Sequence, residues 1–359
     1  MSGISRREML RRGALAMTGG LAGCVASDTR SLDSDGGYRG IAAKETRMQE
    51  FERGLIHSHC VGAEWPEFLG RVALAESFVI ETEECNPNGP IAVRGIKAGD
   101  AIAVHLEQIE MVGPFRAPNG GPFVEGMGPP VPLEYREGYF HWPKHFRLKA
   151  KPSVGNVAVL PEPTEETRKL CRMKRAHPDE PRELQDRGWR RVVRDVRGKH
   201  CHQDCFAATQ GAVVHLKAQV DEAGLCMDDV HGYIGQGEMA FAGIEARARV
   251  QVRVERSRDW LVDWPLIETA DEIMVFASRL EDDWKYVDVV REAYRALREV
   301  VAAKICGSIE EANSIVATAV DLRNCAIYGL GEGYIPQHKN LPPFDIAVVA
   351  CLPKEVFAL

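Results

Sequence analysis

The residues best suited to bind a metal ion lie close together in the chain, within residues 200–245. Asp229 and His231 are separated by one residue, and on a β-strand such side chains point to the same face. A carboxylate oxygen and an imidazole nitrogen that converge from one face are typical ligands of a divalent ion. An Asp-x-His pair is also an ordinary surface feature, and both interpretations stay open at this point. The predicted metal ligands are Asp204, Asp229, His231, His200 and His202.

Two glutamates follow this pair in the sequence and could lie close to it. Gly235 and Gly237 flank a Gly-x-Gly turn that can bring the next residue, Glu238, back toward the predicted ligands. Glu238 and Glu245 have opposite parity on an ideal strand, and a bulge at Gly243 would place both on one side. Both carboxylates could therefore lie beside the Asp229–His231 pair.

Strands must position these side chains. Apolar and polar residues alternate over 101–109, 214–220 and 244–255, which predicts half-buried strands, and residues 346–352 form a continuous apolar strand. A helical hairpin is predicted over residues 283–320. The sequence as a whole predicts a mainly β protein with α+β character.

The predicted hairpin has its own signals. Gly307 separates two helices, and Ser308 with Glu311 forms a capping box at the start of the second helix. An apolar stripe at three- and four-residue steps predicts the buried side of the first helix. The stripe consists of Val287, Val290, Tyr294, Leu297 and Val301.

Composition shifts along the chain suggest its division into domains. Residues 113–152 are rich in proline and glycine, and we expect an irregular loop there. The predicted division is a signal over 1–24, a flexible tether over 25–50, an N-terminal β domain over 51–160, a charged insertion over 161–199 and a C-terminal β domain over 200–359 that contains the hairpin.

The N-terminal residues resemble an export signal. Ser5 to Leu10 resembles a twin-arginine motif, and a weakly apolar segment follows it. Leu21 to Cys24 then resembles a lipoprotein box, so that lipid could be attached to Cys24. We expect export by the twin-arginine route to the periplasm or the outer surface, with the membrane contacted only through that lipid. The alternative is an arginine-rich tail that matches by chance.

Composition excludes some classes of function. The chain has 359 residues, of which 45% are hydrophobic and 27% charged, as in an ordinary globular protein. The net charge is −7 and the pI is about 5.9, which argues against nucleic acid as a partner.

The order of its motifs resembles that of the acetamidase/formamidase family. That family has a central pattern G-x-H-G-G-N-x-D, then an apolar strand, then G-D-x-H-x-x-Q-G-D-G-E and an Ile-Glu pair. The likeness extends in order over residues 72–357, and no single motif carries it. The matching segments here are Gly198-Lys199-His200, Asp204-Cys205, Gly211, Asp229-x-His231, Gly235-x-Gly237-Glu238, Ile244-Glu245, Asn88 to Val93, Lys151 to Val159, Asp321-Leu322-Arg323 and Leu352 to Phe357.

The resemblance implies a jelly-roll-like β-sandwich with a smaller barrel-like piece and a C-terminal helical hairpin. It implies hydrolysis of a small-molecule amide to acid and ammonia, assisted by a divalent ion, Zn²⁺ or Ca²⁺. Under it, Asp204, Asp229 and His231 hold the ion. The predicted catalytic residues are Glu238 and Glu245: Glu238 is the base that takes a proton from water and returns it to the leaving nitrogen, and Glu245 orients these groups or adds a ligand. It also implies a homodimer.

The chain departs from the family pattern within the central motif. The family's Gln and Asp are Ile234 and Gln236 here, and its Gly-Gly-Asn run is replaced by Cys201-His202-Gln203. These changes keep open a second interpretation, a non-catalytic metal- or ligand-binding lipoprotein on the same fold.

Overall fold

The computed structural model describes most of the chain after residue 47. The described ranges are 48–53, 65–84, 87–121, 123–144, 146–165, 167–168, 199, 201–240, 242–258, 260, 262–280, 284–327 and 346–357. Contacts divide the chain into two units, Met1–Arg47 and Met48–Leu359. The predicted signal lies outside the described residues, and so does the predicted tether as far as residue 47. The predicted insertion is described only at residues 161–165, 167–168 and 199.

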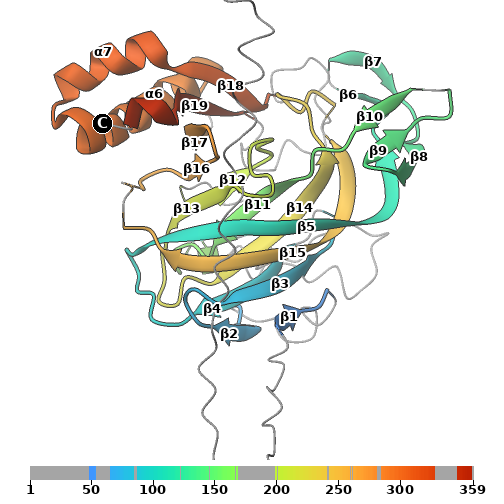
Figure 1. Ribbon diagram of the computed structural model, residues 1–359, viewed down its shortest axis with the longest axis horizontal. Coiled ribbons are helices and arrows are strands. Elements are labelled where there is room, and N and C mark those ends of the chain that lie inside the picture. The colour runs from blue at the N-terminus through green and yellow to red at the C-terminus, as the bar shows by residue number, and fades with distance from the viewer. Residues whose placement is uncertain are drawn as a thin grey trace, which may run out of the picture. The chain divides into compact units, whose positions relative to one another are not determined.

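Strands dominate the described part, which confirms the mainly β prediction (Figure 1). The first strands are β1 (Gln49–Phe51), β2 (Gly70–Val72), β3 (Ser77–Thr82), β4 (Asn88–Val93), β5 (Ala101–Ala117), β6 (Gly120–Gly121), β7 (Val124–Met127), β8 (Val131–Arg136), β9 (Tyr139–His141) and β10 (Arg147–Lys149). The later strands are β11 (Ser153–Val159), β12 (Cys201–Gln203), β13 (Val213–Lys217), β14 (Leu225–Tyr233), β15 (Ile244–Arg256), β16 (Leu266–Glu268), β17 (Glu272–Ser278), β18 (Asp321–Ala326) and β19 (Ala347–Pro353).

One mixed sheet connects strands that are far apart in the sequence. β15 pairs with β5 along one side, and with β14 and then β3 along the other. β14 also pairs with β11 and β4, and β13 joins β5 to β16. From β16 the sheet continues through β17 and β19 to β18. Strands from 51–160 and from 200–359 therefore share one sheet, and the domain boundaries stay a prediction.

β15 shows how the pattern of residues determines its faces. Its apolar side chains are buried from Ile244 to Val254, and the polar side chains between them are half-buried, as the alternation predicts. The polar face is covered by a ladder of opposite charges to neighbouring strands. These ion pairs are Arg247–Glu83 at 3.0 Å, Arg249–Glu81 at 2.8 Å and Arg253–Glu107 at 2.9 Å.

The region 113–152 is not the irregular loop that its composition suggested. β5 extends through residue 117, and β8, β9 and β10 form an antiparallel meander beyond it. Phe140 is fully buried there and packs edge-on against Phe115 at 5.3 Å between ring centroids. The prediction was wrong because the prolines and glycines lie mostly at strand ends and turns. There they separate short strands and do not prevent the strands from forming.

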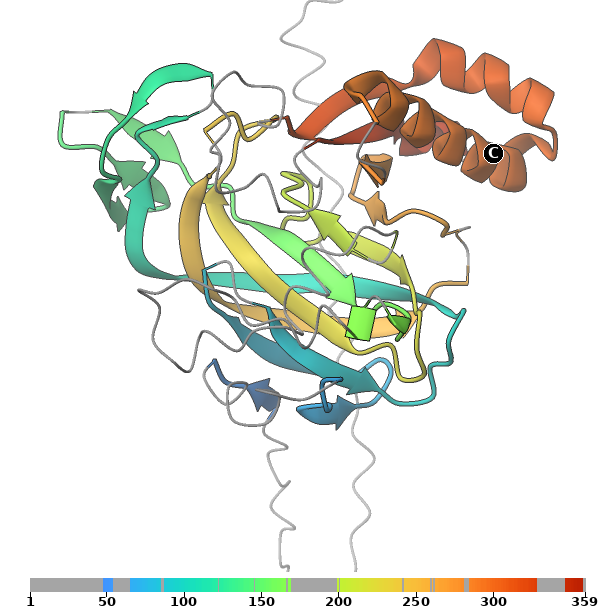
Figure 2. The ribbon, with the colours of Figure 1, turned by 180° about the vertical axis from the view of Figure 1, so that it is seen from behind.

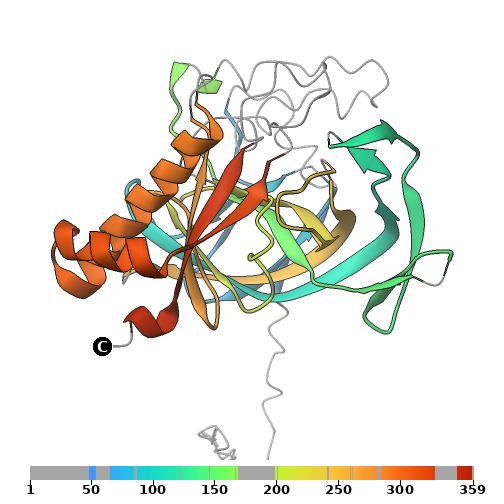
Figure 3. The same cartoon turned by 90° about the horizontal axis from the view of Figure 1, so that it is seen from above.

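The predicted hairpin is confirmed. Helix α6 (Tyr286–Val301) runs into a π-helical turn, η1 (Ala302–Cys306), and α7 (Ile309–Ala319) follows; the 3₁₀-helix η4 (Lys354–Phe357) lies after β19. Gly307 ends the first helix with a left-handed φ of 67°, and the Ser308 side chain accepts a hydrogen bond from the Glu311 N–H. Figure 3 shows the hairpin beside β17, β18 and β19.

The buried side of α6 differs from the predicted stripe. Val287 is 53% exposed, whereas two alanines, Ala293 and Ala296, are buried. Small residues let the helix approach β17 and β19 closely, but they give a weak apolar signal in the sequence. The buried residues of α6 are Val289, Ala293, Ala296, Leu297, Val300 and Val301. Among the described residues, no helix is long and apolar enough to cross a membrane.

Candidate metal centre

β14 carries the central pair of the candidate site. Asp229 and His231 are both buried, with exposed fractions of 4% and 1%. β14 lies between β11 and β15 at this point, and the register places Ser153 opposite His231 on one side and Glu245 opposite it on the other. Figure 2 shows β11 and β14 side by side in green and yellow. Because His231 has a paired strand on each side, the residues opposite it on β11 and β15 determine what lies next to its side chain.

Asp204 reaches the same place from a separate segment. It directly follows β12, and its N–H donates to the Gly155 carbonyl at 2.7 Å, which attaches the segment to β11. Glu238 arrives from the turn after β14, where its N–H donates to the Gly235 carbonyl. Gly237 anchors that turn to β18, because its N–H donates to the Asn324 carbonyl at 3.1 Å.

The three buried acids share an unusual backbone conformation. Asp204, Asp229 and Glu238 have φ values of 52°, 61° and 43°, in the left-handed region that residues other than glycine rarely adopt. Such a conformation costs on the order of 1 kcal/mol per residue and persists where the surrounding structure enforces it, often at functional sites. All three residues belong to groups of possible ligands that include His231.

Glu245 enters the site by strand pairing. Its Oε1 lies 3.4 Å from His231 Nε2 and also accepts the Gly243 N–H at 3.1 Å. The bulge lies at Gly232 in β14 and not at Gly243 as predicted, because Tyr233 pairs with Ile244. An extra residue in either strand changes which side chains of β14 and β15 share a face. A bulge in β14 can therefore replace the one that was predicted just before β15.

Five of the predicted residues therefore converge. Two groups of possible ligands share His231, and within each group the ligand atoms lie within 4.8 Å of one another. The groups are Asp204 with Asp229 and His231, and His231 with Glu238 and Glu245. His200 lies outside the described residues. His202 is placed only by register, opposite Val157 of β11.

Two glycines allow this convergence. A Cβ atom on Gly155 would lie 2.5 Å from the Asp229 carbonyl oxygen and 2.9 Å from His231 Cε1. One on Gly243 would lie 2.7 Å from His231 Cδ2. Both distances are too short for real atoms, so the imidazole fits against backbone on two sides. The site is thus a cradle that only glycine at 155 and 243 leaves open.

The electrostatics of the cluster favour a cation. Burial alone lowers the pKa of His231, but Glu245, Asp229 and Glu238 together raise it well above its ordinary value. Burial and repulsion from Asp204 raise the pKa of Glu238 well above its ordinary value. Four carboxylates thus surround one imidazole in a dry environment, and a positive charge among them relieves their repulsion.

The donor set fits a divalent ion. Glu238 Oε2 and Glu245 Oε2 are buried and have no hydrogen-bond partner among the described residues. Buried polar atoms are rarely left unsatisfied, so such orphans mark an absent partner. Carboxylate oxygens with one imidazole suit Zn²⁺ or Ca²⁺. Asp204, Asp229 and His231 would hold the ion, with Glu238 and Glu245 beside it.

Sequence reasoning missed a buried polar pair next to the site. Asn156 of β11 donates from Nδ2 to Asp228 Oδ1 at 2.6 Å, and both residues are almost fully buried. Asn156 and Asp228 lie opposite each other on β11 and β14, and each is next in sequence to a residue of the site, Gly155 or Asp229. The sequence signal that could have revealed this pair is Asn156 itself, a polar residue within the apolar segment from Val154 to Val159.

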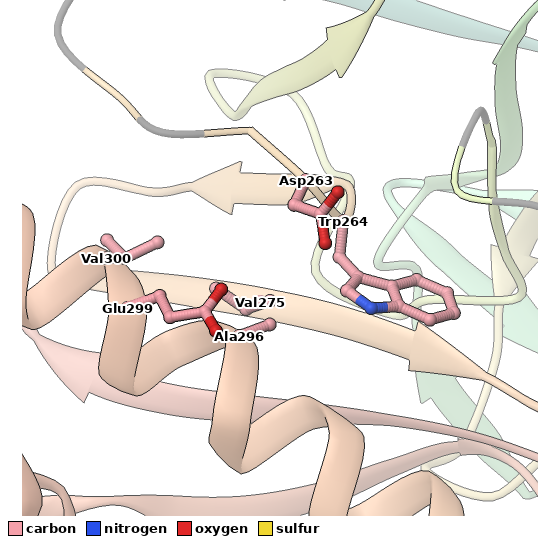
Figure 4. Close-up of a pocket in the computed structure, with 6 residues that line it drawn as sticks. All are labelled: Asp263, Trp264, Val275, Ala296, Glu299 and Val300. Carbon is pink, nitrogen blue, oxygen red and sulfur yellow. The ribbon is translucent and has the colours of Figure 1, made fainter.

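Other polar arrangements lie elsewhere. His215 is hydrogen-bonded by Nδ1 to Ser257 Oγ at 2.8 Å and by Nε2 to Glu268 Oε2 at 3.2 Å, and the Lys354 ammonium contacts Glu268. Figure 4 shows a small pocket between α6 and the segment before β16, and no predicted site residue lines it. It is lined by Asp263, Trp264, Val275, Ala296, Glu299 and Val300.

Solved structures with the same fold exist. A predicted acetamidase/formamidase from Thermoanaerobacter tengcongensis aligns with a TM-score of 0.65 at 17% identity, over 84% of this chain and 96% of that one. An acetamidase from Bacillus halodurans aligns at 0.60 and 19% identity, over 83% and 95%. An acetamidase from Yersinia enterocolitica aligns at 0.65 and 17% identity, over 89% and 96%. No protein-family model and no curated protein sequence matches the chain.

Proposed function

We propose that this chain, which has the fold of the acetamidases, hydrolyses a small amide at a divalent-metal centre. The observation that carries the proposal is the convergence of Asp204, Asp229, Glu238 and Glu245, from separate segments, around the buried His231. Orphaned buried atoms in that cluster and the glycine cradle around His231 support a bound ion.

Each residue has a role that its position supports. Asp204, Asp229 and His231 hold the ion, because their ligand atoms lie within one coordination sphere of each other. A divalent ion in such a site polarises an amide carbonyl and lowers the pKa of water. Glu245, whose Oε1 lies 3.4 Å from His231 Nε2, is placed to add a carboxylate ligand on the same side of the ion.

Glu238 carries the proton in this proposal. Without an ion, burial and repulsion from Asp204 raise its pKa, and a cation beside it would lower that pKa again. A group of this kind can take a proton from the attacking water and give it to the departing nitrogen. Glu238 Oε1 lies 3.9 Å from His231 Nε2, which keeps it next to the ligands.

Two of the departures from the family pattern, Ile234 and Gln236, lie outside the cluster. Ile234 is buried at 6% exposure and packs in the main hydrophobic core, and Gln236 is exposed. Neither belongs to the two groups of possible ligands. These two changes therefore leave the five converging side chains in place, which supports retained catalysis.

A second candidate is a metal-binding protein without catalysis. The burial of the centre favours it, because Asp204, Asp229, His231 and Glu238 are at most 7% exposed. Structural metal sites are closed, whereas catalytic sites keep a position open to substrate.

Glu245, with 22% of its side chain exposed, lies at the most open side of the cluster. Small amides, which need little space, are the substrates consistent with such a centre.

Ammonia release tests the proposal. The purified full-length protein is loaded with Zn²⁺ or Ca²⁺ and incubated with formamide, acetamide and longer linear amides. We expect release from at least one amide, loss of release after chelation and recovery on adding the ion back. A metal-loaded protein that releases no ammonia from any amide would support the second candidate. Export, lipid attachment at Cys24 and a homodimer stay predictions from the sequence.

A further inference from the structure

Ser153 has a buried hydroxyl group beside the metal centre. It is the first residue of β11, its exposed fraction is 0%, and its Oγ has no hydrogen-bond partner among the described residues. The register of β11 and β14 places it directly opposite His231. Directly opposite residues of an antiparallel pair point to the same face, with Cβ atoms about 5 Å apart.

His231 has an unpartnered atom of its own. Its Nε2 faces Glu245 and Glu238, at 3.4 Å and 3.9 Å, so this nitrogen points toward the acidic cluster. Its Nδ1 is buried without a partner among the residues that the structure describes. Two unsatisfied groups, one able to donate and one able to accept, therefore lie on cross-strand neighbours.

The requirements of a metal ligand connect the two atoms. A histidine that binds a metal through one nitrogen donates the N–H of the other to an acceptor, which fixes the ring and its tautomer. We propose that Ser153 is a positioning residue for His231: its Oγ accepts a hydrogen bond from Nδ1–H, directly or through one water, when Nε2 binds the ion. This inference rests on the metal part of the proposed function and not on the amide.

The proposal predicts opposite effects on the two states of the protein. In the metal-free protein the Ser153 hydroxyl is an unsatisfied buried group, so its removal in Ser153→Ala leaves the melting temperature unchanged or raises it. In the loaded protein the same substitution removes the acceptor for His231 and should weaken metal binding by about 10- to 100-fold. A hydroxyl that only supports the fold would lower the melting temperature of the metal-free protein.

The test measures Zn²⁺ binding by competition with a chelating dye, and the melting temperature of the metal-free protein. It compares full-length wild type with Ser153→Ala, Ser153→Thr and Thr82→Val. Ser153→Thr keeps a hydroxyl and should restore most of the affinity. Thr82 is the matched control, since it is equally buried but its hydroxyl accepts the Ala248 N–H at 3.2 Å. Thr82→Val should lower the melting temperature and leave Zn²⁺ affinity unchanged.

Two results would overturn the inference. One is wild-type Zn²⁺ affinity in Ser153→Ala, and the other is weaker binding together with an equally destabilised metal-free protein. If wild type binds no Zn²⁺, this inference and the metal part of the proposed function both fail. A wild type that binds Zn²⁺ and a weakened Ser153→Ala, with no amide hydrolysed, would contradict the amidase proposal alone.

Discussion

His231 and Glu245 stand opposite each other on β14 and β15, with the imidazole Nε2 3.4 Å from a carboxylate oxygen. The strand that provides Glu245 also buries a row of apolar side chains in the main core. A slip of β15 by one residue would turn that row to the outside, so core packing fixes the register that places Glu245 beside His231. Stability and site geometry are thus determined by the same pairing.

Removing the proton carrier should abolish turnover without removing the ion. In Glu238→Gln the side chain keeps its shape but cannot exchange a proton, and we expect kcat to fall by about 10²- to 10⁴-fold. Metal content and KM should change little, because the three ligands remain. Steady-state ammonia release and elemental analysis of the same sample check this. Glu76→Gln, a change at an exposed residue of the loop before β3, is the control. Equal kcat in Glu238→Gln and wild type would rule out the assigned role.

Closing the glycine cradle should damage the site directly. In Gly155→Ala the new methyl group would meet the Asp229 carbonyl at 2.5 Å and His231 Cε1 at 2.9 Å, so one of them must move. We expect a loss of about 1–3 kcal/mol in the free energy of unfolding, as for other overpacked cores, together with loss of bound metal. Denaturant unfolding and metal analysis measure the two effects. Gly235→Ala, where no atom lies within 4 Å of the new carbon, should change neither. Normal metal content in Gly155→Ala would contradict the cradle.

A carboxylate far from the centre should make stability depend on acid. The hydrogen bond from His215, with those from Lys354 and Trp260, lowers the pKa of Glu268 from its ordinary 4.5 to about 2, against the effect of burial. Because the folded-state pKa is the lower one, its stabilisation is present above pH 4.5 and is lost as pH falls toward 2. Glu268 is partly exposed, so screening limits the effect to about 1 kcal/mol.

Unfolding free energies measured between pH 5 and 2.5 test this expectation. Glu268→Gln should be less stable than wild type at pH 5, and the difference should shrink as the pH falls. Glu76→Gln should follow the wild-type curve throughout. A constant difference between Glu268→Gln and wild type across the range would show that the carboxylate charge is not the cause.

Much of the framework could be predicted from the sequence, because it rests on local patterns. The alternation over 244–255 gave the faces of β15, and Gly307 with Ser308 gave the junction of the hairpin. The meander of β8, β9 and β10 was missed, since its strands are short and separated by prolines and glycines. Composition alone does not distinguish frequent turns from an irregular loop.

Candidate residues for the site could be selected from the sequence, but the way in which they meet could not. The spacing of Asp229 and His231 in the sequence indicates a possible ligand pair, whereas the position of the bulge at Gly232 depends on how β14 and β15 pair. Ser153 and Gly155 lie in the segment from Lys151 to Val159 that resembles the family pattern, but that match gave them no role, because their importance depends on the residues across the strand from them. Such relations are set by tertiary pairing and are not encoded in any single segment.

The metal content of the purified full-length protein tests the central claim most directly. Asp229→Asn keeps the volume of a ligand and removes its charge, so it is the matched variant. Elemental analysis after loading with Zn²⁺ or Ca²⁺ and removal of free ion should find a stoichiometric divalent ion in wild type and little in Asp229→Asn. Equal content in the two proteins, or no ion in either, would contradict a metal centre at the point where Asp204, Asp229 and His231 meet.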